Sequence, residues 1–182
     1  MELYPLKFDP IFKERIWGGK RLETLFGKNL GGNDLIGESW ELSAVEDNVS
    51  VVTNGPLAGN DLQELIEIYM GDLVGEKVFE KFGTEFPLLI KLIDANDDLS
   101  IQVHPNDKVA MERHNAFGKT EMWVALDDSE KPRLITGFNQ NTDKDTFLKM
   151  LNENIVTQLF NYENVEKGDV FFVPAGRVHA IC

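Results

Sequence analysis

Short runs of apolar residues, separated by glycine, asparagine and aspartate, recur along most of the 182-residue chain. Runs of this length between turn-forming residues are typical of strands. We expect strands at residues 39–45, 49–53, 86–94, 99–105, 121–126, 133–138 and 169–174. Apolar residues at helical spacing predict helices near 61–82 and near 143–160. The pattern favours a mainly β protein, a barrel or sandwich with inserted α-helices, formed by residues 1–182 as a single domain.

One predicted strand lies within DLSIQVHP, residues 98–105, and carries unusual side chains on its polar face. Alternation places Ser100, Gln102 and His104 on one side, opposite the apolar residues. The same pattern also fits a half-exposed edge strand that ends at Pro105, because proline cannot donate to a sheet ladder. The role of this face therefore depends on what other segments bring to it.

Composition narrows the classes of function. The formal net charge of -13 leaves no basic surplus to displace counterions from a nucleic-acid backbone. A single cysteine, Cys182, predicts no intrachain disulfide. The first residues lack the pattern of a secretory signal, and no apolar stretch approaches the length of a membrane span. We expect a cytoplasmic protein without nucleic-acid or membrane partners. The charge does not exclude a small anionic ligand, because two or three local cations are enough to bind one.

The segment GDVFFVPAGRVHAI, residues 168–181, has the spacing of a tight hairpin. Gly168 can open a turn before the apolar run, Pro174-Ala175-Gly176 can form the next turn, and His179 follows after two intervening residues. Such a hairpin delivers His179 to a barrel interior. The alternative is an ordinary hairpin in which the histidine is incidental.

This spacing resembles the second motif of the cupin superfamily, G-x5-P-x-G-x2-H. The first cupin motif usually carries H-x-H and a downstream glutamate; the corresponding place here reads Gln102-Val103-His104, with Glu121 downstream. Glutamine in place of the first histidine, followed by K-x-E-M, resembles type I mannose-6-phosphate isomerase (phosphomannose isomerase) in its short bacterial form. Further segments in that family's order are IWGG, GESWELSA, PLLIKLIDANDDLSIQVHP and FGKTEMWVAL.

The resemblance implies a cupin-type double-stranded β-helix, or jelly-roll, barrel that binds one Zn²⁺ per chain. It implies an aldose–ketose isomerase of mannose metabolism, which interconverts mannose 6-phosphate and fructose 6-phosphate through a cis-enediol. The implied zinc ligands are Gln102, His104, Glu121 and His179. The implied residues around the phosphosugar are Lys91, Ser100 and Lys119 at the phosphate, with Trp17 and Glu38 in the pocket wall.

Some of these residues also have simpler explanations. Lys91 is the one charge within PLLIKLI, and a salt bridge to Asp94 or an ammonium that reaches the sheet edge would satisfy it equally well. Trp17 fits an ordinary core aromatic residue. His114 matches no ligand position and reads as a surface residue.

The family's chain continues past the strand that carries His179 and supplies a catalytic arginine, so the catalytic residue would lie beyond Cys182 and is left unassigned. We expect the barrel to be incomplete at the C-terminus, its open strand edges to favour association, and isomerase activity to require the remaining strands. The main alternative is a non-catalytic cupin fragment that binds metal or sugar phosphate. A cupin oxygenase is disfavoured by Gln102 and by the two lysines Lys91 and Lys119.

Overall fold

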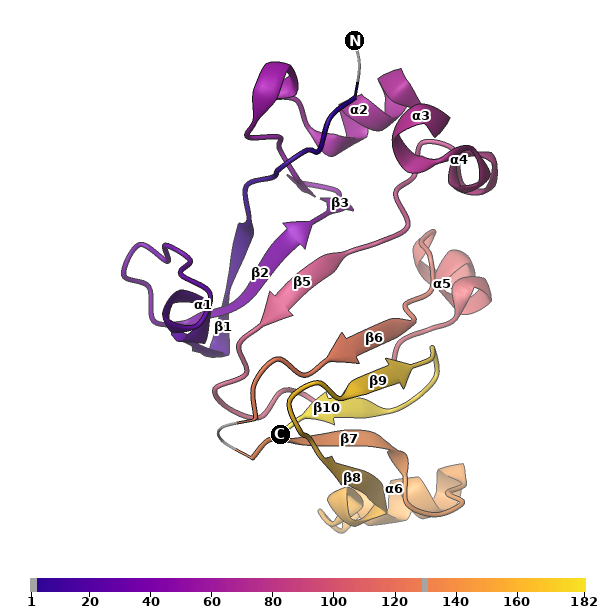
Figure 1. Ribbon diagram of the computed structural model, residues 1–182. Helices are drawn as coiled ribbons and strands as arrows, with labels where there is room; N and C mark the ends of the chain where they lie inside the picture. The colour runs from indigo at the N-terminus through magenta and orange to yellow at the C-terminus, as the bar shows by residue number, and fades with distance from the viewer. Residues whose placement is uncertain (1–2, 129–130) are drawn as a thin grey trace. The chain divides into compact units, whose positions relative to one another are not determined.

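The computed structural model describes residues 3–128 and 131–182. The chain folds into two compact units, Met1–Asn96 and Asp97–Cys182, each with its own sheets and helices (Figure 1).

The first unit is built on a three-stranded antiparallel sheet in the order β1–β2–β5. These strands span Ile11–Gly19, Ile36–Leu42 and Ile90–Ile93, and a small hairpin of β3 (Ala44–Val45) and β4 (Asn48–Val49) follows β2. In the register, Glu38 lies opposite Lys13 on β1 and Ile93 on β5. Glu38 therefore sits in the middle strand, flanked on both sides by backbone that holds it in place.

Helices and turns cover the rest of this unit. They are α1 (Arg21–Thr24), η1 (Gly55–Leu57), α2 (Leu62–Tyr69), α3 (Gly71–Val74) and α4 (Glu76–Phe82). Helix α2 begins with a capping box, in which the Asp61 carboxylate accepts from the Glu64 N–H and the Glu64 carboxylate accepts from the Asp61 N–H. Its apolar side buries Leu65 against Val52 and Leu57.

The second unit contains two small antiparallel sheets. One has the order β10–β7–β8, formed by His179–Ile181, Arg133–Phe138 and Phe160–Asn164; the other pairs β6 (Glu121–Val124) with β9 (Val170–Val173). The helices are α5 (Asp107–His114), α6 (Lys144–Asn152) and η2 (Val156–Leu159). A core of Ile135, Phe160 and Ala180 joins the three strands of the larger sheet.

The prediction of a mainly β fold with inserted helices is confirmed by this arrangement. Within residues 3–128 and 131–182 the strands form four separate small sheets, and no closed barrel is found. None of the helices in the described ranges is long and apolar enough to cross a membrane.

The predicted strand at residues 99–105 is wrong as a regular strand. Its pairing is limited to one bridge between Gln102 and His179, together with a bond from the Leu99 N–H to the Ile181 carbonyl. Residue 99 pairs with 181 whereas 102 pairs with 179, so the segment holds one residue too many for a continuous ladder. The expected apolar face consequently does not form a buried surface, and Ile101 and Val103 are exposed.

Candidate metal centre

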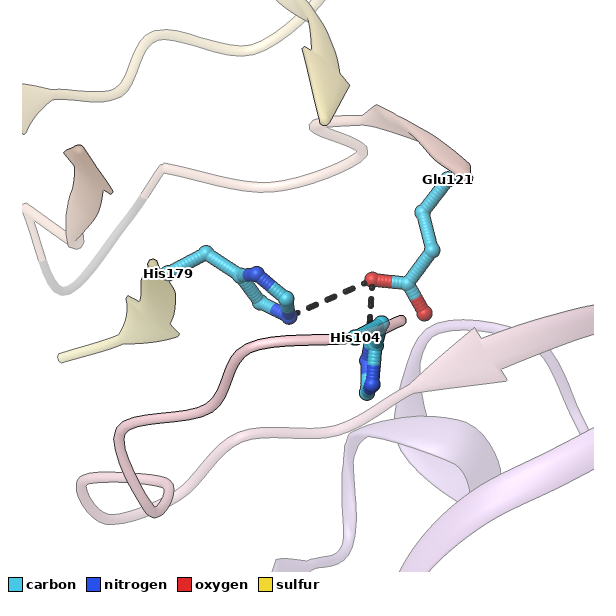
Figure 2. Close-up of side chains that lie close together, drawn as sticks. All are labelled: His104, Glu121 and His179. Atoms are coloured by element: carbon cyan, nitrogen blue, oxygen red, sulfur yellow. Dashed lines mark ion pairs between the residues drawn. The ribbon is translucent and has the colours of Figure 1, made fainter. Parts of the chain in front are cut away.

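Three side chains with metal-ligand chemistry meet in the second unit: His104, Glu121 and His179. Figure 2 shows the Glu121 carboxylate between the two imidazoles. Glu121 Oε2 lies 3.7 Å from His104 Nε2 and 3.4 Å from His179 Nε2, and one ligand atom from each residue lies within 4.8 Å of the others. Two imidazoles and one carboxylate are a common donor set for a catalytic divalent metal such as zinc.

His179 is fixed by a turn and a strand. It begins β10 opposite Thr136 of β7, and only 3% of its surface is exposed. The preceding turn contains Gly176 at φ 86°, a conformation that favours glycine because a side chain would be strained there. The strands on either side of this turn, β9 and β10, lie in different sheets, so the predicted hairpin is wrong. The predicted turn does form, and it leads His179 into a buried position.

The backbone also holds His104 beside His179. Gln102 and His179 exchange both backbone hydrogen bonds, each at 2.9 Å, and the Gly176 N–H donates to the His104 carbonyl at 2.8 Å. His104 therefore lies two residues after Gln102, which is paired directly with His179. The two rings lie 4.8 Å apart, although the segment is no regular strand.

The protonation of His179 follows from its other nitrogen. Nδ1 lies 2.8 Å from the Arg177 carbonyl oxygen, which can only accept. Nδ1 therefore carries a proton, and in the neutral imidazole the Nε2 lone pair then faces the cluster. This is the arrangement of a metal-binding histidine whose orientation is set by an outer hydrogen bond.

The surroundings of the Glu121 carboxylate show whether these three residues fit a metal ion. Glu121 begins β6, and its Oε2 atom is buried without a hydrogen-bond partner. A buried carboxylate oxygen left unpaired is costly, so such an atom calls for an explanation. A cation shared with the two Nε2 atoms would satisfy it, and the residues present therefore fit a divalent metal.

The other residues expected near the metal lie around this cluster. Gln102 pairs with His179 through its backbone, and its side chain is exposed. Ser100 is exposed on the irregular segment before it. The Lys119 ammonium lies 3.3 Å from Glu121 Oε1.

Lys91, Glu38 and Trp17 belong to the first unit. The Lys91 ammonium lies 2.6 Å from Glu38 Oε1, so its partner is Glu38. Asp94, the partner considered from the sequence, instead accepts from the Arg21 N–H at 2.7 Å. Trp17 is half-buried at the end of β1, where Gly37 leaves room for its ring: a Cβ added there would lie 2.5 Å from the indole.

Sequence reasoning missed Arg15 as a member of this group. The Arg15 guanidinium donates to Glu38 Oε2 at 2.7 Å, and the Trp40 indole N–H donates to the same oxygen at 3.2 Å. Glu38 is thus a buried carboxylate that contacts two cations and an indole. The sequence did contain a signal for this cluster. Side chains alternate along a strand, so Glu38 and Trp40 share a face of β2, and cations on the neighbouring strands could have been placed opposite them.

These contacts change the titration of Glu38. Burial alone would raise its pKa, but the hydrogen bond and charge of Lys91, with Trp40 and Arg15, outweigh it and hold the pKa below the ordinary 4.5. At pH values above the ordinary pKa, the ionised carboxylate therefore stabilises the folded state. This contribution is lost as the pH falls through the lower pKa that Glu38 has in the folded state.

We expect acid to destabilise the wild-type protein more steeply than a Glu38→Gln variant, because the amide has no proton to gain. Urea unfolding followed from about pH 6 to about pH 3 measures both slopes. Parallel curves for the two proteins would contradict this assignment of the Glu38 pKa.

Two histidines and a carboxylate on a mainly β fold define a candidate single-metal site. Comparison with known proteins adds the family. The family described as phosphomannose isomerase type I, catalytic domain, matches residues 5–143, which include His104 and Glu121, while His179 lies outside that range. The chain belongs to the type I phosphomannose isomerase family.

Related proteins support the same placement. Mannose-6-phosphate isomerase ManA of Bacillus subtilis is 40% identical over 185 residues, which cover 100% of this chain and 55% of ManA. The crystal structure of the mannose 6-phosphate isomerase from Bacillus subtilis has a TM-score of 0.87 and 37% identity, covering 99% of this chain and 55% of that one. A putative mannosephosphate isomerase from Archaeoglobus fulgidus has a TM-score of 0.83 and 29% identity, over 100% of this chain and 59% of that chain. The chain thus spans little more than half the length of these relatives.

Proposed function

We propose that this chain is the metal-binding part of a zinc-dependent mannose-6-phosphate isomerase, which interconverts mannose 6-phosphate and fructose 6-phosphate. The observation that carries the proposal is the buried Oε2 atom of Glu121, without a hydrogen-bond partner and facing two histidine Nε2 atoms. That donor set occurs in a chain of the phosphomannose isomerase family. We also propose that the fold is part of a cupin-type jelly-roll barrel.

In this proposal His104, Glu121 and His179 hold the zinc, and Gln102 adds its amide oxygen. The position of Gln102 supports this role, since its backbone bridges to His179. When bound, zinc would supply a Lewis acid that polarises the sugar carbonyl and stabilises charge that develops on its oxygen. Two neutral imidazoles and one carboxylate leave the metal with a net positive charge, which suits this purpose.

The reaction itself moves one proton between C2 and C1 of the open-chain sugar through a cis-enediol. The two histidines are unsuited to be the base: both Nε2 atoms face Glu121 Oε2, where a bound metal would occupy their lone pairs, and His179 Nδ1 donates to the Arg177 carbonyl. In this scheme their task is to hold and orient, and proton transfer belongs to another group.

For the phosphate we propose Ser100 and Lys119 of the second unit. The Lys119 side chain is 47% exposed, so its ammonium is accessible to an anion such as a phosphate. In the first unit, Lys91 as a phosphate ligand and Trp17 and Glu38 as pocket residues stay predictions from the family resemblance.

A coupled assay for fructose 6-phosphate tests the proposed reaction. In a protein of the relatives' full length that contains this chain, we expect turnover of mannose 6-phosphate that is abolished by a chelator and restored by zinc. Turnover that survives metal removal would contradict the metal-dependent mechanism. Zinc-dependent, saturable binding of mannose 6-phosphate without any turnover would replace the isomerase with a sugar-phosphate-binding protein.

A further inference from the structure

The two carboxylate oxygens of Glu121 have different surroundings. Oε2 is buried, lacks a hydrogen-bond partner and faces both imidazoles. Oε1 lies 3.3 Å from the ammonium of Lys119. Only one of the two oxygens is therefore presented to the two histidines.

The backbone around Lys119 is tied to both segments that carry the histidines. The Lys119 N–H donates to the carbonyl of Pro105, which follows His104, at 3.1 Å. The Thr120 hydroxyl accepts from the Ala175 N–H at 3.3 Å, within the turn that leads to His179. Hydrogen bonds to the segments that carry the two histidines thus hold the backbone at Lys119 and Thr120 in place. From this position the Lys119 ammonium lies beside Glu121 Oε1.

We propose that Lys119 is a positioning residue for the metal: it holds Glu121 Oε1 and reserves Oε2 as a single-oxygen ligand. A carboxylate can otherwise bind a cation through both oxygens and occupy two positions around it. Keeping Oε1 on Lys119 leaves one more position for substrate oxygens. The inference rests on the proposed metal centre and gives Lys119 a role additional to phosphate recognition.

Two physical effects of Lys119 act in opposite directions, which makes the inference testable. Its positive charge repels a bound cation, so removing the charge alone would tighten metal binding. The side chain is 47% exposed, and solvent weakens that repulsion. Removing an outer partner that orients a ligand, by contrast, typically weakens metal binding by about 10- to 100-fold.

The experiment is a Co²⁺ titration of the wild-type protein, Lys119→Met, Lys119→Arg and the control Lys108→Met, followed by the visible absorption of the bound ion. Lys108 lies exposed on α5. We expect Lys119→Met to weaken Co²⁺ binding about 10-fold and to alter the absorption spectrum, because Glu121 would be free to bind through both oxygens. We expect Lys119→Arg to retain the wild-type spectrum and Lys108→Met to change neither property.

Unchanged or tighter Co²⁺ binding by Lys119→Met, with the wild-type spectrum, would overturn the positioning role and leave the proposed metal centre intact. Failure of the wild-type protein to bind Co²⁺ would instead remove the metal centre and this inference together. Thermal unfolding of each metal-free variant shows whether its fold is preserved. We expect the metal-free proteins to unfold alike, because the Lys119 side chain is 47% exposed and its ion pair therefore contributes little to stability.

Discussion

Substitution of Glu121 by glutamine is expected to weaken zinc binding by more than about 100-fold, because loss of an outer partner alone costs about 10- to 100-fold. Glu121 contributes the one carboxylate of the cluster, and the amide would bring a neutral, weaker donor to the position that Oε2 occupies. Zinc affinity measured by competition with a chromogenic chelator gives the size of the effect.

A matched control is Glu112→Gln, an exposed glutamate on α5. It should leave zinc affinity unchanged. The two variants lose the same formal charge, so a general electrostatic effect would weaken both equally. Equal zinc affinity for Glu121→Gln and the wild-type protein would show that the metal lies elsewhere.

Substitution of Glu38 by alanine is expected to lower the free energy of unfolding by about 2 kcal/mol. The carboxylate is buried and contacts the side chains of Arg15 and Lys91, which are 38% and 20% exposed. Its loss leaves two partly buried cations without their partner. The expected effect is smaller than for a fully buried pair, because both cations retain some contact with water.

Urea unfolding measures this effect, with Asp34→Ala as the control. Asp34 pairs with Lys20, and these two side chains are 61% and 57% exposed. Such a pair contributes little, so the control should change stability by less than about 0.5 kcal/mol. A Glu38→Ala variant no less stable than Asp34→Ala would contradict the structural importance of the Glu38 cluster.

Local signals in the sequence were enough for helices α2 and α6 and for the turn before His179. Asp61 and Glu64 satisfy the exposed N–H groups at the start of α2 without help from distant residues. The same holds for the turn before His179, whose glycine adopts a backbone conformation that few other residues accept. Such features depend on neighbours in sequence, and that is why they could be predicted.

The DLSIQVHP segment was harder to predict, because alternation in one segment carries no information about the register of its partner. The surplus residue between Leu99 and Gln102 interrupts the ladder, and this appears only when the segment is set against β10. The partner of Lys91 was missed for a similar reason. Charge alone cannot show whether a lysine faces Asp94, Glu38 or a ligand, since that choice depends on contacts between distant strands.

The candidate metal site was predicted through family resemblance, and the structure brings three of its four expected ligands together: His104, Glu121 and His179. The role of the fourth, Gln102, remains a prediction, supported by the bridge from its backbone to His179.

The most direct test is X-ray absorption at the zinc K-edge of the zinc-loaded protein. The structure predicts a first shell of nitrogen and oxygen that contains two imidazoles, with one imidazole lost in His179→Ala. A zinc signal with no imidazole scattering, or one left unchanged by His179→Ala, would contradict a metal centre built from His104, Glu121 and His179.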